Sequence, residues 1–245
     1  MSNFLTEHPA LYEARFPDPD QEHPRLVSAA LTSRLGPGPW SILDLGSGTG
    51  RDAGALVEAG HEVVGVDSSP AMVAHARAHH AGARVEEGDL RTVRLGRTFV
   101  AVSCMDSALL YCHTHHDLAA CGAVLREHLR PGGVLVAEMR NAAAYLGSAR
   151  GLDQPVDDAF VRAGVRYASS TLLWIDHRAQ LLRRRRTWTR PGHDPLVQES
   201  AWRLLFPEEA RAWLASCGFT DVELRDETGP GLTGRRLHIT ATYAG

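Results

Sequence analysis

Short apolar runs alternate with amphipathic stretches through the first half of the chain. Each run is too short for a helix and is bounded by turn residues, which is typical of buried parallel strands. The predicted strands are 42–45, 63–66, 83–85, 99–104 and 134–137, and the predicted helices are 51–59, 70–80 and 117–129. Alternation of strands and helices predicts an α/β fold, with a parallel sheet covered by helices on both faces.

The alternation breaks after residue 138. Two longer strand-like runs, 165–175 and 180–189, are joined by a short polar turn, and 200–205 is a candidate third strand. We therefore expect residues 141–206 to form an antiparallel β insertion, a lid that also contacts substrate.

The two ends of the chain complete one domain, 1–245. Apolar residues at helical spacing over 26–35 stop at Gly-Pro-Gly-Pro, so 1–39 is predicted to be a helical N-terminal cap. After the insertion, the parent fold resumes with a helix over 207–217 and two last strands. Those strands are expected at 221–224 and 236–243.

Composition narrows the function classes. With 245 residues and 44% apolar positions, the chain can bury a sizeable core. Its 26 basic and 29 acidic residues give a net charge of −3, so no global field favours nucleic acid or a membrane surface. All 26 basic residues are Arg, which excludes Schiff-base, pyridoxal and P-loop lysine chemistry.

The expected location is the cytoplasm. No apolar run is long enough to span a membrane, and the first ten residues lack the basic start and apolar core of a signal peptide. The four cysteines form no Cys-x-x-Cys pair, so we expect reduced thiols and no disulfide framework.

The strongest local signal is a glycine-rich turn after the first predicted strand. Gly46, Gly48 and Gly50 follow the run Ile-Leu-Asp-Leu and precede a helix. Glycines here allow a ligand to approach the backbone closely. Asp67 ends the second strand, where a carboxylate can accept both hydroxyls of a ribose. Its alternative role is to cap the helix that starts at Pro70, a role that a neighbouring serine could fill instead.

Two ligands fit the glycine turn by itself. Residues 48–53 match the G-x-G-x-x-A variant of the dinucleotide fingerprint, which leaves NAD open. Asp44 precedes the turn by two residues, and Asp89 follows the third strand, where it could bind an adenine amino group. Acidic groups this close disfavour a pyrophosphate and favour a ligand with a cationic group.

The motifs DLGSGTG, VVGVD, EEGDL and LREHLRPGGVLV together resemble the class I S-adenosylmethionine-dependent methyltransferases. The resemblance covers roughly residues 40–140 and, more loosely, the last part of the chain. It implies a Rossmann-like seven-stranded, mostly parallel sheet of order 3-2-1-4-5-7-6 with an antiparallel last strand. It also implies S-adenosyl-L-methionine as the cofactor and S-adenosyl-L-homocysteine as its product.

The resemblance carries a set of cofactor-binding residues onto this chain. The glycines would line the methionine and ribose portion, Asp67 the ribose hydroxyls, and Asp89 with Leu90 the adenine edge. Met72 at helical spacing is either an adenine contact or core. The full predicted set is Tyr12, Asp44, Gly46, Ser47, Gly48, Gly50, Asp67, Ser68, Met72, Gly88, Asp89, Leu90 and Met105.

Within that superfamily the chain is similar to glycine and amino-sugar N-methyltransferases. They share a tyrosine near the N-terminus that covers the methionine end, here Tyr12, and an antiparallel lid after strand five. No Asn-Pro-Pro-Tyr segment and no Pro-Cys pair occurs, which argues against methylation of nucleobases or of glutamine side chains.

Candidates for acceptor chemistry follow the fourth strand: Asp106, Tyr111, His113, His115 and His116. A histidine near its usual pKa can accept a proton at neutral pH. Of these candidates, His113 and Tyr111 are the predicted catalytic residues. The alternative is an exposed helix start. The Cys and His spacing matches no zinc pattern, so no metal is expected.

A run of four arginines, 183–186, lies in the predicted lid. Alternate side chains of a strand point to opposite faces, so one pair could recognise an anionic acceptor, and the alternative is a solvated edge strand. The predicted substrate-binding residues are Arg140, Tyr167 and Arg184.

The sequence thus predicts an S-adenosylmethionine-dependent methyltransferase that acts on N or O of a small molecule in specialised metabolism. The alternatives are an NAD(P)-binding oxidoreductase and a non-catalytic cofactor-binding partner protein. The expected partner is a small-molecule acceptor, without nucleic acid or membrane, and the expected state is a monomer or homodimer.

Overall fold

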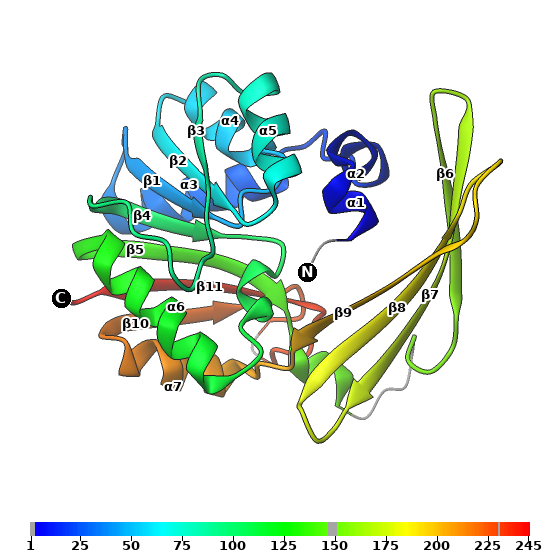
Figure 1. Ribbon diagram of the computed structural model, residues 1–245. Helices are drawn as coiled ribbons and strands as arrows, with labels where there is room; N and C mark the ends of the chain where they lie inside the picture. The colour runs from blue at the N-terminus through cyan, green and yellow to red at the C-terminus, as the bar shows by residue number, and fades with distance from the viewer. Residues whose placement is uncertain (1–2, 147–150, 230) are drawn as a thin grey trace.

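The computed structural model describes residues 3–146, 151–229 and 231–245, and it contains a seven-stranded sheet and a separate four-stranded sheet (Figure 1). The large sheet has the order β10-β11-β5-β4-β1-β2-β3, and β11 is antiparallel to both of its neighbours. Its strands are β1 Ser41–Leu45, β2 Glu62–Asp67, β3 Arg84–Glu87, β4 Phe99–Cys104, β5 Leu129–Arg140, β10 Phe219–Arg225 and β11 Arg236–Tyr243. The predicted strand order and the antiparallel last strand are confirmed.

Helices cover both faces of this sheet and bury two apolar clusters (Figure 1). Successive side chains of a strand point to opposite faces of the sheet, so Ile42 packs in one cluster and Leu43 in the other. The helices of the first face are α3 Glu22–Leu35, α4 Arg51–Glu58 and α5 Pro70–His79, and those of the second are α6 His115–His128 and α7 Pro207–Ser216. The parallel strands therefore end at one edge between two covered faces, where ligands bind in open α/β sheets.

β5 is longer than the sequence predicts. The prediction placed the strand at 134–137 and a helix up to 129, whereas the helix ends at His128 and β5 begins at Leu129. Pairing with β4 joins Phe99 to Leu129 and then shifts register, so the Pro-Gly-Gly segment is an irregularity inside the strand.

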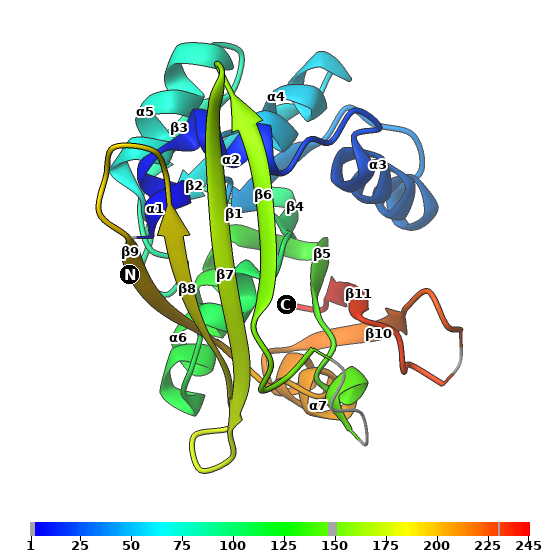
Figure 2. The same ribbon diagram turned by 90° about the vertical axis from the view of Figure 1, so that its right-hand side faces the viewer.

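The lid is a four-stranded antiparallel sheet of order β6-β7-β8-β9 (Figure 2). Its strands are β6 Val156–Arg162, β7 Val165–Asp176, β8 Leu181–Thr189 and β9 Leu196–Arg203. The insertion is confirmed with one strand more than predicted, and the candidate third strand begins earlier than expected. Leu182 and Trp202 join the cluster that includes α6 and α7, which attaches the lid to the domain.

Two short helices, α1 Phe4–Glu7 and α2 Pro9–Arg15, lie between α5 and the lid (Figure 1). Phe4, Leu5 and Leu11 bury their side chains with Trp188 of β8. Two 3₁₀ turns, η1 Ala108–Tyr111 and η2 Ala142–Tyr145, follow β4 and β5. All four cysteines are free and buried, and none of the described helices is long and apolar enough to cross a bilayer.

Candidate functional site

The glycine turn between β1 and α4 has a left-handed backbone at each of its three glycines. The φ angles are 80° at Gly46, 54° at Gly48 and 78° at Gly50. A Cβ on Gly46 would lie 2.5 Å from the Cβ of Ala108, and one on Gly50 would lie 2.6 Å from the Cβ of Ala76, so packing requires these two glycines. A Cβ on Gly48 would meet nothing within 4 Å. Gly48 therefore faces open space, where a ligand can approach the backbone.

Asp67 is aimed at this turn by two backbone hydrogen bonds. The amide of Gly48 donates to one carboxylate oxygen at 2.9 Å, and the amide of Ser69 donates to the other at 2.8 Å. Burial raises the pKa of Asp67, and these two hydrogen bonds oppose the shift. The helix cap is supplied instead by the Ser69 side chain, which accepts from the Met72 amide. Asp67 is therefore available to accept ligand hydroxyls.

Asp89, after β3, is paired with an arginine that the sequence analysis missed. The Arg91 guanidinium donates to both carboxylate oxygens of Asp89, at 2.8 and 2.5 Å, and the Arg91 amide adds a bond of 2.8 Å. These contacts lower the pKa of Asp89. The Gly88 amide donates to the Asp67 carbonyl at 3.0 Å, which brings the ends of β2 and β3 together.

The remaining predicted cofactor residues differ in exposure. Ser68 is exposed and Leu90 is half-buried, so both can contact a ligand. Met72 and Met105 are buried, and Met72 is only 2% exposed, which is consistent with its core alternative. Ser47 is buried, and its hydroxyl has no hydrogen-bond partner in the described part of the chain.

Asp44 lies buried behind the turn, and the Ser103 hydroxyl donates to its carboxylate at 2.7 Å. Burial raises the pKa of Asp44 to about 7, and the negative charge of Asp52 adds to the shift. Burial therefore favours the protonated form of Asp44, and a nearby cation would favour its charged form.

Tyr12 of α2 reaches over to the end of β4. Its hydroxyl donates to the carboxylate of Asp106 at 2.8 Å. Asp106 and Ser107 both have positive φ, 46° and 66°, which is strained for residues with a side chain. This backbone is held because the Ser107 amide donates to the Glu138 carbonyl and the Ser107 hydroxyl accepts from the Arg140 amide, both at 3.0 Å.

The inner face of the lid presents arginines toward this edge. Arg184 and Arg186 lie on the same face of β8 and are both half-buried. The guanidinium carbons of Arg184 and Arg140 each lie 4.7 Å from the ring centre of Trp202. Burial and the charge of Arg184 lower the pKa of Arg186 to about 10. Among the described residues, neither Arg184 nor Arg186 forms an ion pair with a carboxylate.

The outer face of the same strand is different. Arg183 donates to Asp176 at 2.8 Å, and Arg185 donates to Glu199 at 2.8 Å. The predicted alternation is confirmed. The alternative of an edge strand is wrong, because β8 pairs with both β7 and β9.

The predicted catalytic and substrate residues spread over two regions. His113 contacts the Ala201 carbonyl through Nε2 at 2.9 Å, which ties the η1–α6 loop to the lid. Tyr111 lies beside Trp202, and partial desolvation raises the pKa of its phenol. Tyr167 stacks on Phe160 at the end of the lid that contacts α1, away from Trp202.

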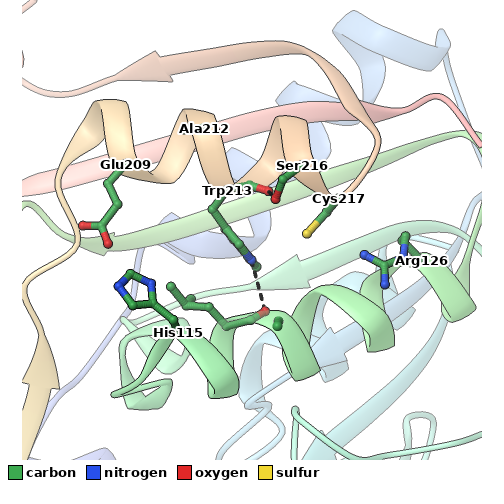
Figure 3. Close-up of a pocket in the computed structure, with 9 residues that line it drawn as sticks. His115, Arg126, Glu209, Ala212, Trp213, Ser216 and Cys217 are labelled. Atoms are coloured by element: carbon green, nitrogen blue, oxygen red, sulfur yellow. Dashed lines mark hydrogen bonds between the residues drawn. The ribbon is translucent and has the colours of Figure 1, made fainter.

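A surface pocket lies elsewhere, between α6 and α7 (Figure 3). Its lining includes His115, Leu118, Glu209 and Trp213, and the Trp213 indole donates to the Leu118 carbonyl at 3.1 Å. None of the predicted cofactor residues lines it. No trio of His, Cys, Asp or Glu side chains suited to a metal occurs in the three described segments.

Comparison with known proteins finds similarity to methyltransferases. A family model described as a methyltransferase domain matches residues 42–133. The chain is 40% identical over 98 residues to a Streptomyces venezuelae protein named dTDP-3-amino-3,4,6-trideoxy-alpha-D-glucopyranose N,N-dimethyltransferase. That match covers 40% of this chain and 41% of the relative. A Streptomyces fradiae dTDP-3-amino-3,6-dideoxy-alpha-D-glucopyranose N,N-dimethyltransferase is 36% identical over 110 residues, 45% of this chain and 43% of its own length. The chain thus spans about two fifths of these curated relatives.

Solved structures match over nearly their whole length. Streptomyces venezuelae DesVI superimposes with a TM-score of 0.77 at 26% identity, and the match covers 98% of each chain. CalS10 from Micromonospora echinaspora, an amino pentose methyltransferase bound to S-adenosylmethionine, gives 0.76 at 26% identity over 99% of each chain.

Proposed function

We propose that this chain, a class I S-adenosylmethionine-dependent methyltransferase by its fold and its methyltransferase domain, methylates the amine of a nucleotide-linked amino sugar. The observation that carries the proposal is the inner-face pair Arg184 and Arg186, two half-buried guanidinium groups without a carboxylate partner. Names of relatives that act on dTDP-linked amino sugars support the same acceptor class.

The residues at the glycine turn fit the cofactor. Open space over Gly48 admits the ligand, and Asp67 offers both carboxylate oxygens to ribose hydroxyls. Asp89 and Leu90 would contact the adenine, and Tyr12 would cover the methionine end. The bound cofactor supplies a methyl group on a sulfonium, and the chain has to orient the acceptor nitrogen toward it.

The lid arginines would hold the acceptor by its diphosphate. Guanidinium groups match phosphate oxygens with paired hydrogen bonds, and each charge-assisted bond contributes about 1.5–3 kcal/mol. Arg140, which stacks on the same indole as Arg184, can add a third positive charge. Because the three arginines repel one another, an anion between them relieves an unfavourable arrangement.

Asp106 would receive the amine. An amine must present a free lone pair to be methylated, so an ammonium has to give up a proton. The Asp106 carboxylate, held by the Tyr12 hydroxyl, can bind the ammonium and take that proton. Orientation accounts for most of the expected rate gain, since well-placed reactants can be worth roughly 7–11 kcal/mol. Tyr111 and His113 stay predicted catalytic groups.

The test compares matched double variants of one strand. The assay uses methyl-labelled S-adenosylmethionine with dTDP-3-amino-3,4,6-trideoxy-α-D-glucopyranose and with the same sugar lacking the nucleotide. Replacing Arg184 and Arg186 by Gln should raise the acceptor KM about tenfold or more, because two charge-assisted contacts are lost. The control replaces the outer pair, Arg183 and Arg185, by Gln and should leave KM unchanged.

Two results would contradict the proposal. One is equal turnover of the sugar with and without its nucleotide. The other is the same KM for the inner and outer variants. Affinity for S-adenosylhomocysteine should be unchanged in both variants, which separates acceptor binding from cofactor binding.

Location and assembly are proposed on other grounds. Four free, buried thiols support work in a reducing compartment, and we propose the cytoplasm. We propose a monomer or homodimer, which light scattering of the purified protein distinguishes.

A further inference from the structure

His23, near the start of α3, bridges two carboxylates from distant parts of the chain. Its Nδ1 lies 3.0 Å from Asp52, in the first turn of α4, and its Nε2 lies 3.1 Å from Glu138, on β5. The side chains are 16%, 19% and 4% exposed, respectively. Both ring nitrogens are therefore engaged in a largely buried ion-pair arrangement.

The surroundings favour a charged ring. Although burial opposes the charge, hydrogen bonds to Asp52 and Glu138 raise the pKa of His23 to about 10. Arg236 of β11 approaches Glu138 at 3.5 Å, and Asp44 of β1 interacts electrostatically with both His23 and Asp52. Arg51 also approaches Asp52 at 3.7 Å, so charged groups of both signs gather around the His23 bridge.

His23 lies two residues after Gln21, where the N-terminal segment joins α3. Gln21, just before the helix, has a left-handed backbone with φ of 51°, and the Glu22 amide donates to Asp18 at 3.1 Å. The segment before Gln21 connects α3 to the preceding helix α2, which carries Tyr12. The contacts of His23 therefore hold the point from which this segment reaches the edge of the sheet.

We propose that His23 is a positioning residue for the cofactor: by bridging Asp52 and Glu138 it fixes the N-terminal segment and the start of α4 around the methionine end of the ligand. This inference rests on the cofactor site proposed above. It does not depend on the identity of the acceptor, because His23, Asp52 and Glu138 lie on α3, α4 and β5 and not on the lid strands.

The test separates the methionine end from the adenosine end by using two ligands. S-adenosylhomocysteine carries an amino acid group that 5′-methylthioadenosine lacks. In His23→Gln, which keeps a polar side chain without the charge, the affinity for S-adenosylhomocysteine measured by calorimetry should fall roughly ten- to a hundredfold. The affinity for 5′-methylthioadenosine should change by less than about threefold.

Further variants keep the test informative if His23→Gln is unstable. Asp52→Asn breaks one half of the bridge and should give the same selective loss. His79→Gln, on the outer side of α5, is the control and should bind both ligands like the parent. Hydrogen exchange should show faster exchange in α2 and the first turn of α3 only in the bridge variants.

The outcomes are distinct. An equal loss for both ligands, or no loss for either, overturns the role of His23. A parent protein that binds neither ligand overturns the proposed cofactor site itself.

Discussion

Gly48 allows the cofactor site to be tested separately from the fold. Gly48→Ala places a methyl group in the open space above the turn, with no protein atom within 4 Å. A left-handed alanine costs about 1–2 kcal/mol, and the stiffer unfolded chain returns about 0.4–1 kcal/mol. The net loss of roughly 1 kcal/mol should lower the melting temperature by only about 2–4 °C for a chain of this size.

Gly96 offers a matched control. Its φ is 65°, against 54° for Gly48, and a Cβ there also meets nothing within 4 Å. Both substitutions therefore carry the same kind of backbone cost, and only Gly48 lies at the proposed ligand. Gly50→Ala differs, because its Cβ would overlap Ala76 at 2.6 Å, and overpacking adds about 1–3 kcal/mol.

The assay pairs thermal unfolding with calorimetric titration of S-adenosylhomocysteine. Gly48→Ala should weaken binding at least about tenfold, or 1.4 kcal/mol, while Gly96→Ala should bind like the parent. The reasoning is refuted if the two variants lose similar stability and both keep the parent affinity.

Three further predictions concern buried or paired groups. The unfolded chain releases the Asp44 proton near pH 3.8, whereas the native state keeps it up to about pH 7. The free energy of unfolding of the parent should therefore fall as the pH rises through this range. Asp44→Asn should lack this loss when melting temperatures are compared from pH 4 to 8. His128→Leu removes the ring nitrogen that accepts from the Leu95 amide at 3.0 Å, and urea unfolding should report a loss of about 1–3 kcal/mol. Arg91→Gln removes the guanidinium that holds Asp89, so S-adenosylhomocysteine binding should weaken several-fold. The melting temperature should change by under about 4 °C, because the pair is partly exposed.

The sheet could be predicted because its signals are local. Buried parallel strands are continuous apolar runs, and glycine or proline marks their ends. β6 gave no such signal, since most of its residues are exposed at the edge of the lid and its Asp-Asp pair interrupts the pattern. β5 was shortened in the prediction because Pro-Gly-Gly normally indicates a turn, and here it forms an unpaired irregularity, with φ of 77° at Gly132, between two paired parts of one strand.

The meeting of the glycine turn with Asp67 could also be predicted, while the ligand contacts of these residues stay predictions. Gly46 to Gly50 and Asp67 lie at strand ends that the sequence marks, so their meeting follows from the parallel sheet. The bridge of His23 joins residues 29 and 115 positions away, and no local pattern indicates it. Arg91 could have been found, because an acid followed two residues later by arginine can close a local ion pair. Asp106 was one candidate among several, and only its bond to Tyr12 distinguishes it.

The two faces of β8 limit how this protein can change. An insertion or deletion of one residue inside 181–189 would rotate every following side chain to the opposite surface. The guanidinium groups of the inner face would then point to solvent, and those neutralised by Asp176 and Glu199 would turn inward. Length variation among natural or engineered versions should therefore collect in the hairpin tips, around 163–164 and 190–195, while this central strand keeps its length.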